Sequence, residues 1–235
     1  MNDCIAIIPA RGGSKRIPRK NIKKFCGRPM IYYSIKNAIN SKCFKRIIVS
    51  TDDEAIAKIS SKIGAEILFK RPKNLSTDKA LTRDVVNHTI NFLDKLGEKF
   101  KYVCLIYPTA PLIQKKKLIE GFKIIKSNKF DFVFTVTEYQ YPIQRSFKID
   151  KFKNVKMLYP KYRYIMSNNL EKIYHDAGQF YFGKKKSFLN YKPTFGKKSF
   201  PIILPKSLVQ DIDDIDDWKI AENLFKTLYE TKKNN

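Results

Sequence analysis

A basic segment with two glycines near the start of the chain could bind phosphate groups. It spans residues 9–21 and has the sequence PARGGSKRIPRKN. Gly12 and Gly13 allow the backbone to approach a ligand closely, including at positive φ angles. Backbone amides and basic side chains are the donors that polyphosphates bind, and the basic side chains here include those of Arg11, Lys15, Arg19 and Lys20. The segment matches neither GxxxxGK[ST] nor GxGxxG, so a solvated turn is the alternative, but its position after a predicted strand favours phosphate binding.

Two aspartates near the end of the chain could bind a divalent cation. Residues two apart in an extended segment project from the same side, so the carboxylates of Asp211 and Asp213 can meet one ion. Mg²⁺ is commonly bound by protein carboxylates together with triphosphate oxygens. The alternative is an acidic helix start that the helix dipole favours. We keep that interpretation for Asp214, Asp216 and Asp217.

The two histidines give no catalytic pattern. His88 lies among apolar residues of a predicted helix, and we expect it to be a packing or surface residue. His175 precedes an Asp-Ala-Gly segment and is a candidate substrate contact. Neither residue fits a Ser-His-Asp order or the spacing of zinc ligands.

Alternating apolar segments predict the elements that position these residues. Short apolar or β-type runs predict strands, and apolar residues at helical spacing predict the helices between them. The expected strands are 4–10, 46–50, 65–69, 101–107 and 131–138. The expected helices are 29–40, 53–64, 85–96, 115–127 and 214–229.

This alternation predicts an α/β protein with a three-layer, Rossmann-like fold and a mostly parallel sheet. We expect residues 1–235 to form a single domain. Ligands of such sheets bind beyond the carboxyl ends of the strands. The segments after Ala10, Ser50, Phe69 and Tyr107 should therefore lie together at one edge of the sheet.

The alternation fails between residues 139 and 170. This segment is rich in aromatic and basic residues. Such a density of aromatic side chains in an exposed loop would form an apolar patch. We therefore predict an inserted segment that serves as an interaction arm or a dimerisation arm, and it is called the arm below.

Composition limits the function without identifying it. The formal net charge is +25, which would suit a nucleic-acid-binding protein. The lysines are spread over nearly every segment, so we favour a solvated basic surface that attracts an anionic substrate. The four cysteines are scattered, as expected for reduced thiols. No membrane span or signal peptide is expected, which indicates a cytoplasmic protein.

Several of these segments resemble the CMP-sialic acid synthetases and their relatives among the nucleotide-sugar pyrophosphorylases. Residues 9–21 are similar to that family's nucleotide-binding loop nearly residue for residue. The other matches follow in order over almost the whole chain: VSTDDE at 49–54, RP and LS within 71–76, YPTAP at 107–111, DAGQFYF at 176–182 and QDID at 210–213.

The resemblance implies a cytidylyltransferase that uses CTP, Mg²⁺ and an acidic nine-carbon sugar. It implies catalytic phosphate contacts for Arg11 and Lys20, and a metal site at Asp211 and Asp213, of which Asp211 is also catalytic. The other nucleotide-binding residues that it implies are Ala10, Gly12, Gly13, Ser14, Asn21, Arg71, Ser76 and Thr82. On the sugar side it implies Tyr107, Thr109, His175, Asp176, Gln179 and Tyr181.

By the same resemblance, the arm should cross to the second subunit of a homodimer and help to close its sugar site. Arg145 and Arg163 are then candidates for binding the sugar carboxylate, and the alternative for either is a solvated surface charge. No nucleic acid or membrane partner is expected.

Three departures from the sialic acid enzymes point to a subfamily. Tyr107 stands where those enzymes typically have Gln, Asp176-Ala-Gly178 replaces their Asn-Gly, and the arm begins with EYQYPIQRSF at 138–147. Together these segments most closely resemble the pseudaminic acid cytidylyltransferases. Synthetases for N-acetylneuraminic acid, legionaminic acid or Kdo are the alternatives with the same chemistry, and a basic nucleic-acid-binding protein is the alternative of another class.

Overall fold

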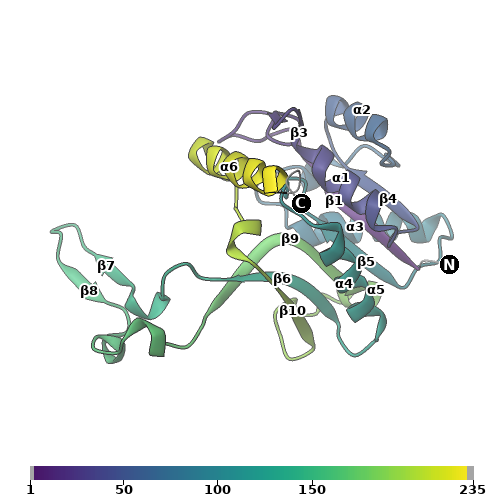
Figure 1. Ribbon diagram of the computed structural model, residues 1–235. Helices are drawn as coiled ribbons and strands as arrows, with labels where there is room; N and C mark the ends of the chain where they lie inside the picture. Colours follow the sequence, from purple (N-terminus) through teal and green to yellow (C-terminus); the bar gives the residue numbers. More distant parts are fainter. Residues whose placement is uncertain (1–2, 232–235) are drawn as a thin grey trace.

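A six-stranded sheet forms the centre of the computed structural model, which describes residues 3–231 (Figure 1). The strand order is β10-β6-β9-β5-β1-β4. Strands β4, β1 and β5 run parallel to one another, as do β10 and β6, whereas β9 is antiparallel to both of its neighbours. The strands are β1 (Cys4–Pro9), β4 (Arg46–Ser50), β5 (Tyr102–Ile106), β6 (Phe132–Glu138), β9 (Tyr174–Lys184) and β10 (Ser199–Leu204).

Helices cover both faces of the sheet, so the predicted three-layer fold is confirmed. Alternate residues of β1 face opposite sides: Ala6 and Ile8 pack with residues of α1, α2 and α4, while Ile5 and Ile7 pack with α3 and α5. The last helix, α6, packs with α1 through a separate aromatic cluster around Phe25. The helices are α1 (Met30–Ser41), α2 (Glu54–Ile63), α3 (Thr82–Lys95), α4 (Lys115–Lys126), α5 (Lys185–Leu189) and α6 (Ile215–Thr231).

Local signals account for the placement of the second helix. The side chain of Asp53 accepts a hydrogen bond from the backbone N–H of Ile56, which caps the start of α2. Gly64 ends the helix at a φ of 111°, a value that favours glycine. The helix therefore begins directly after β4, and Asp52 and Asp53 lie at the carboxyl end of that strand.

The predicted strand at residues 65–69 is wrong. The backbone pairing of this segment with β4 is limited to an isolated bridge from Glu66 to Ile48, and Lys70, just beyond it, forms a second isolated bridge with Thr51. The ring of Phe69 packs against that of Phe92 on α3, with ring centroids 4.9 Å apart. Ala65 and Ile67 pack in the core cluster that contains α1 and α2, whereas Leu68 packs in the cluster that contains α3. The apolar side chains of the segment are therefore packed in the core although a continuous ladder does not form.

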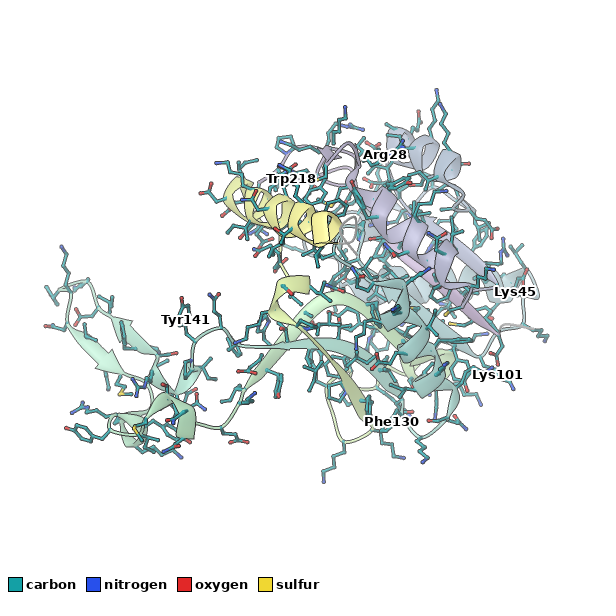
Figure 2. The ribbon with its side chains drawn as sticks, viewed as in Figure 1. Arg28, Lys45, Lys101, Phe130, Tyr141 and Trp218 are labelled. Atoms are coloured by element: carbon teal, nitrogen blue, oxygen red, sulfur yellow. The ribbon has the colours of Figure 1, made fainter. Side chains whose placement is uncertain are left out.

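The arm projects away from the body of the protein, on the chain between β6 and β9 (Figure 1). It contains a short antiparallel hairpin of β7 (Phe147–Ile149) and β8 (Val155–Met157). Its aromatic side chains are open to solvent, with exposed fractions of 76% at Tyr141, 74% at Phe152 and 90% at Tyr164. Tyr141 lies where the arm leaves the body, while Trp218 lies on α6 (Figure 2).

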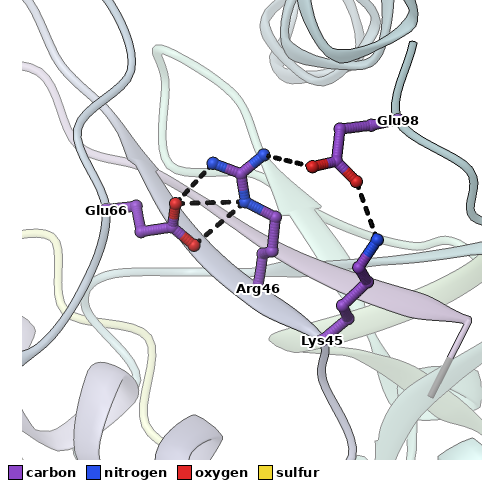
Figure 3. A network of polar contacts seen from close by, with 4 residues as sticks. All are labelled: Lys45, Arg46, Glu66 and Glu98. Carbon is purple, nitrogen blue, oxygen red and sulfur yellow. Dashed lines mark hydrogen bonds and ion pairs between the residues drawn. The ribbon is translucent and has the colours of Figure 1, made fainter. Parts of the chain in front are cut away.

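An ion-pair network joins three segments at the amino-terminal edge of the sheet (Figure 3). Arg46, at the start of β4, donates from Nε to both carboxylate oxygens of Glu66 at 3.0 Å. Its Nη1 donates to Glu98 at 3.1 Å, and Lys45 donates to the other oxygen of Glu98 at 2.8 Å. The network ties the edge strand β4 to the segments on either side of α3, far from the carboxyl ends of the strands.

No helix among the described residues is both long enough and apolar enough to cross a membrane.

Candidate active site

A cavity of about 320 Å³ lies at the carboxyl end of the parallel strands. Its lining includes eight residues that the resemblance implies: Arg11, Ser14, Lys20, Asn21, Arg71, Thr82, Tyr107 and Thr109. These residues come from the loops after β1 and β5, the segment between α2 and α3, and the start of α3. The structure therefore brings together residues that are up to 98 positions apart, from Arg11 to Thr109.

The glycine-containing loop is held by carboxylates from the end of β4. The backbone N–H of Gly12 donates to Asp52 at 3.0 Å, and Arg19 donates to Asp53 at 3.1 Å. A Cβ added at Gly12 would lie 2.8 Å from a carboxylate oxygen of Asp53, so a side chain there would push the loop away. Neither Asp52 nor Asp53 is among the site residues expected from the sequence. Their position at the carboxyl end of a predicted strand was the signal that could have found them.

Other residues of the first loop shape the backbone. Asn21 donates from its side-chain amide to the carbonyl of Arg11 at 2.9 Å, which closes the loop. The backbone N–H of Ala10 bonds to Ser50 of β4, and Gly13 has open space around it. Ser76 lies outside the cavity lining, and its hydroxyl donates to the carbonyl of Pro72. Ser76 thus forms a turn and makes no contact with the cavity.

Two of the cations in the cavity are withdrawn from solvent, Arg71 fully and Lys20 in part. The guanidinium of Arg71 is buried against β4 and donates to the hydroxyl and the carbonyl of Ser50. Burial lowers the pKa of Arg71 to about 10, so the group stays charged near neutral pH. Burial also lowers the pKa of Lys20, against the opposing effect of Asp213 and Asp211. Both cations are therefore fixed in place beside the cavity.

The two aspartates expected to bind metal lie near Lys20. Asp213 accepts a bond from Arg16 at 2.7 Å, and Lys20 donates to the carbonyl of Ile212, between the two aspartates. The described residues contain no group of three or more His, Cys, Asp or Glu side chains that could hold a metal. Two carboxylates fit Mg²⁺ that takes its remaining oxygen ligands from phosphates and water.

A second cavity, of about 290 Å³, adjoins the first. Tyr107 and Thr109 line both cavities. The other implied sugar-side residues in its lining are His175, Asp176 and Gln179, and Asp211 lines it too. A molecule in the second cavity would thus lie beside a nucleotide in the first.

Tyr181 does not line the second cavity, but it contacts two residues that do, Asp176 and Tyr107. Its hydroxyl donates to Asp176, whose other oxygen accepts the backbone N–H of Gly178 at 3.1 Å. The rings of Tyr181 and Tyr107 meet edge to face, with centroids 5.6 Å apart. Burial raises the pKa values of both phenols above the usual value, so both keep their protons. Tyr181 therefore orients Asp176 and Tyr107.

The remaining predicted residues lie elsewhere. Arg145 lies on the arm and donates to the carbonyl of Ile165, and Arg163 is also on the arm. Neither residue lines either of the two cavities described above. His88 packs edge-on against Phe69, with ring centroids 4.7 Å apart, and burial lowers its pKa. The expectation of a packing role for His88 is confirmed.

The fold and the two adjoining cavities define a nucleotidyltransferase, and comparison with known proteins identifies the family. Residues 5–226 match the family described as Cytidylyltransferase, and the chain belongs to that family.

The chain is similar over nearly its whole length to enzymes that activate acidic sugars. It is 44% identical to a pseudaminic acid cytidylyltransferase of Campylobacter jejuni, over 97% of this chain and 98% of that protein. It is 31% identical to an N-acylneuraminate cytidylyltransferase of Escherichia coli O18:K1:H7, over 92% of this chain and 51% of that protein. A solved CMP:2-keto-3-deoxy-manno-octonic acid synthetase complexed with CTP superposes with a TM-score of 0.68 at 13% identity, over 95% of this chain and 98% of that one, which shows a shared fold.

Proposed function

We propose that the protein transfers CMP from CTP to the anomeric hydroxyl of pseudaminic acid and releases pyrophosphate. The observation that carries the proposal is the pair of adjoining cavities that share Tyr107 and Thr109. One cavity is lined by cations that suit a triphosphate, and the other by hydrogen-bonding groups that suit a sugar. The similarity to pseudaminic acid cytidylyltransferases over nearly the full length supports the choice of sugar.

In this mechanism the protein acts by positioning and charge. The triphosphate lies among Arg11, Lys15 and Lys20, which neutralise charge on the phosphate oxygens. The sugar lies in the second cavity, with its anomeric hydroxyl directed at the α-phosphorus. A new bond forms between that oxygen and phosphorus, and the bond to the pyrophosphate oxygen breaks. Two carboxylates line the second cavity, Asp176 and Asp211, and one of them takes the hydroxyl proton.

Mg²⁺ is part of the proposal. Asp211 and Asp213 would hold it, and when bound it would neutralise phosphate charge and favour departure of the pyrophosphate. Arg16, which pairs with Asp213 in this structure, would then exchange that carboxylate for a phosphate oxygen. Removal of the metal with a chelator should abolish turnover, and addition of MgCl₂ should restore it.

A homodimer formed through the arm is also part of the proposal. The exposed aromatic side chains of the arm would be buried against a second copy, which is the usual fate of an apolar surface of this kind. Arg145 and Arg163 could then reach the sugar cavity of the partner. Sedimentation should give twice the mass of one chain, whereas a monomer would contradict this part of the proposal.

The first experiment is a measurement of pyrophosphate release from CTP and Mg²⁺ with three acidic sugars in parallel. Turnover with pseudaminic acid and none with legionaminic or N-acetylneuraminic acid is the expected result. Turnover with another of these sugars would support the proposed reaction and contradict the choice of pseudaminic acid. No turnover with any of them would overturn the proposal, and salt-sensitive binding to polynucleotides would then support the nucleic-acid alternative. A cytoplasmic location belongs to the same proposal.

A further inference from the structure

A carboxylate of the protein lies within the cavity that we assign to the triphosphate. Among the described residues that line this cavity, Asp78 is the one acid, against five cations. Its Oδ2 lies 2.7 Å from the ammonium of Lys15, and its Oδ1 pairs with the guanidinium of Arg11. Hydrogen bonds from Lys15 and then Arg11 lower the pKa of Asp78, so it is ionised near neutral pH.

The other cations of the cavity have different partners. Lys20 bonds to a main-chain carbonyl, Arg16 to Asp213, and Arg71 to Ser50. Asp78 thus pairs with two of the four cavity-lining cations of the glycine-containing loop, Arg11 and Lys15.

Asp78 can leave these cations without the loss of a helix or strand. It lies between the end of a short 3₁₀ turn at Leu75 and the start of α3 at Thr82. The side chain of Asp78 is 46% exposed and that of Lys15 is 82% exposed. Ion pairs exposed to this extent are weak, because water replaces much of what is lost when they separate.

We propose that Asp78 competes with the triphosphate for Arg11 and Lys15. This inference rests on the proposed function. A single carboxylate pairs with the two cations before the nucleotide binds, and the more highly charged triphosphate displaces it. Asp78 pairs with them again as pyrophosphate leaves, which lowers the affinity for that product.

This role makes the affinity of the site depend on the phosphate chain. A ligand that needs Arg11 and Lys15 must displace Asp78, whereas cytidine has no phosphate and need not do so. Removal of the carboxylate should therefore strengthen the binding of CTP and pyrophosphate and leave the binding of cytidine unchanged. If Asp78 had a merely structural role, its replacement would change the affinities for all three ligands alike.

The test compares Asp78→Asn with the unmodified protein by calorimetric titration of pyrophosphate, CTP and cytidine. The expected result is binding of pyrophosphate and CTP that is about three- to tenfold tighter, the size expected for one or two exposed ion pairs, with cytidine unchanged. Stronger inhibition of turnover by pyrophosphate should accompany it.

Glu120→Gln is the matched control. Glu120 is 43% exposed and pairs with Lys117 at 2.8 Å on α4, away from both cavities, so this variant makes the same change in net charge. Its affinities for all three ligands should equal those of the unmodified protein. An equal gain in both variants would mean that net charge alone acts, and this would overturn the inference.

A double-mutant cycle with Lys15→Gln tests whether the gain in affinity comes from the loss of competition by Asp78 or from a change in folding. The gain from Asp78→Asn should shrink when Lys15 is also replaced, because one of the contested cations is then missing. Unchanged or weaker binding of pyrophosphate in Asp78→Asn, at an unchanged melting temperature, would overturn the inference. If the variant is unstable, Asp78→Ser provides the same measurement.

Failure of the inference is distinguishable from failure of the proposed function. If the unmodified protein binds CTP and releases pyrophosphate but Asp78→Asn gains no affinity, only the role of Asp78 is refuted. If the unmodified protein does not bind CTP, the proposed function is refuted.

Discussion

The two ends of the sheet carry similar ion pairs that differ in what surrounds them. At the amino-terminal edge, Arg46 is 19% exposed and bonds to two glutamates that come from different segments (Figure 3). At the carboxyl edge, Arg11 and Lys15 are 34% and 82% exposed and share a single aspartate. The first set satisfies its cations with protein groups, whereas the second leaves more positive charge than the protein neutralises.

This difference distinguishes cations that the protein's own carboxylates stabilise from cations that could bind an anionic ligand. Hydrogen bonds to Glu66 raise the pKa of Arg46 above its usual value, so this cation is stabilised by its partners. Burial lowers the pKa values of Lys20 and Arg71 in the cavity, so these cations are less stable than they would be in water. Cations without enough acidic partners favour an anionic ligand.

The largest effect should come from the metal site. Asp211→Asn should reduce turnover by about 10²- to 10³-fold or more, because phosphate charge in the transition state would lose its main stabilisation. Pyrophosphate release measures the loss. Asp216→Asn, at an exposed residue of α6 that pairs with Lys219, is the control and should keep full activity. Full activity in Asp211→Asn would remove the metal assignment.

Substitution of a cation should reduce activity at the carboxyl edge of the sheet and reduce stability at the amino-terminal edge. Arg11→Gln should lower kcat/KM by roughly 10²-fold at an unchanged melting temperature, because one phosphate contact is lost and a partly exposed pair is worth little to stability. Steady-state kinetics and a thermal melt measure the two quantities. A fall in the melting temperature without a loss of activity would mean that Arg11 stabilises the fold and does not contact the phosphates.

At the amino-terminal edge, Arg46→Gln should affect stability and leave catalysis intact. It should lower the melting temperature by roughly 2–4 °C, the shift that about 1 kcal/mol produces in a chain of this size. The kcat/KM of the folded fraction should match that of the unmodified protein. A loss of activity at an unchanged melting temperature would mean that the network is coupled to the active site.

The smallest effect should be a dependence on alkaline pH. Because burial lowers the pKa of Lys20, the ammonium loses its proton, and the KM for CTP rises, at a lower pH than for a lysine in water. Lys20→Arg should keep its charge and move this rise in KM to higher pH. Identical pH profiles for the two proteins would show that Lys20 does not contact the phosphates.

Local patterns along the chain predicted most of the fold. The apolar runs at β1, β4, β5 and β6 and the helical spacing between them gave the layers correctly. They failed at residues 65–69, where the apolar side chains pack in the core clusters on both faces of the sheet without a continuous ladder. Nothing local specified that β9 would be antiparallel, because the direction of a strand depends on how the chain returns from the arm.

The sequence by itself determined the residue types that we propose for phosphate and metal binding, since glycines, lysines and paired aspartates act through their own chemistry. It also determined the family, through ordered matches along the chain. Only the tertiary structure decided which carboxylates face the basic loop. Asp52, Asp53 and Asp78 are 40 or more residues from Gly12 along the chain. Asp52 and Asp53 reach the loop because the parallel strands β1 and β4 end at one edge of the sheet. Asp78 reaches it from the segment between the 3₁₀ turn at Leu75 and the start of α3.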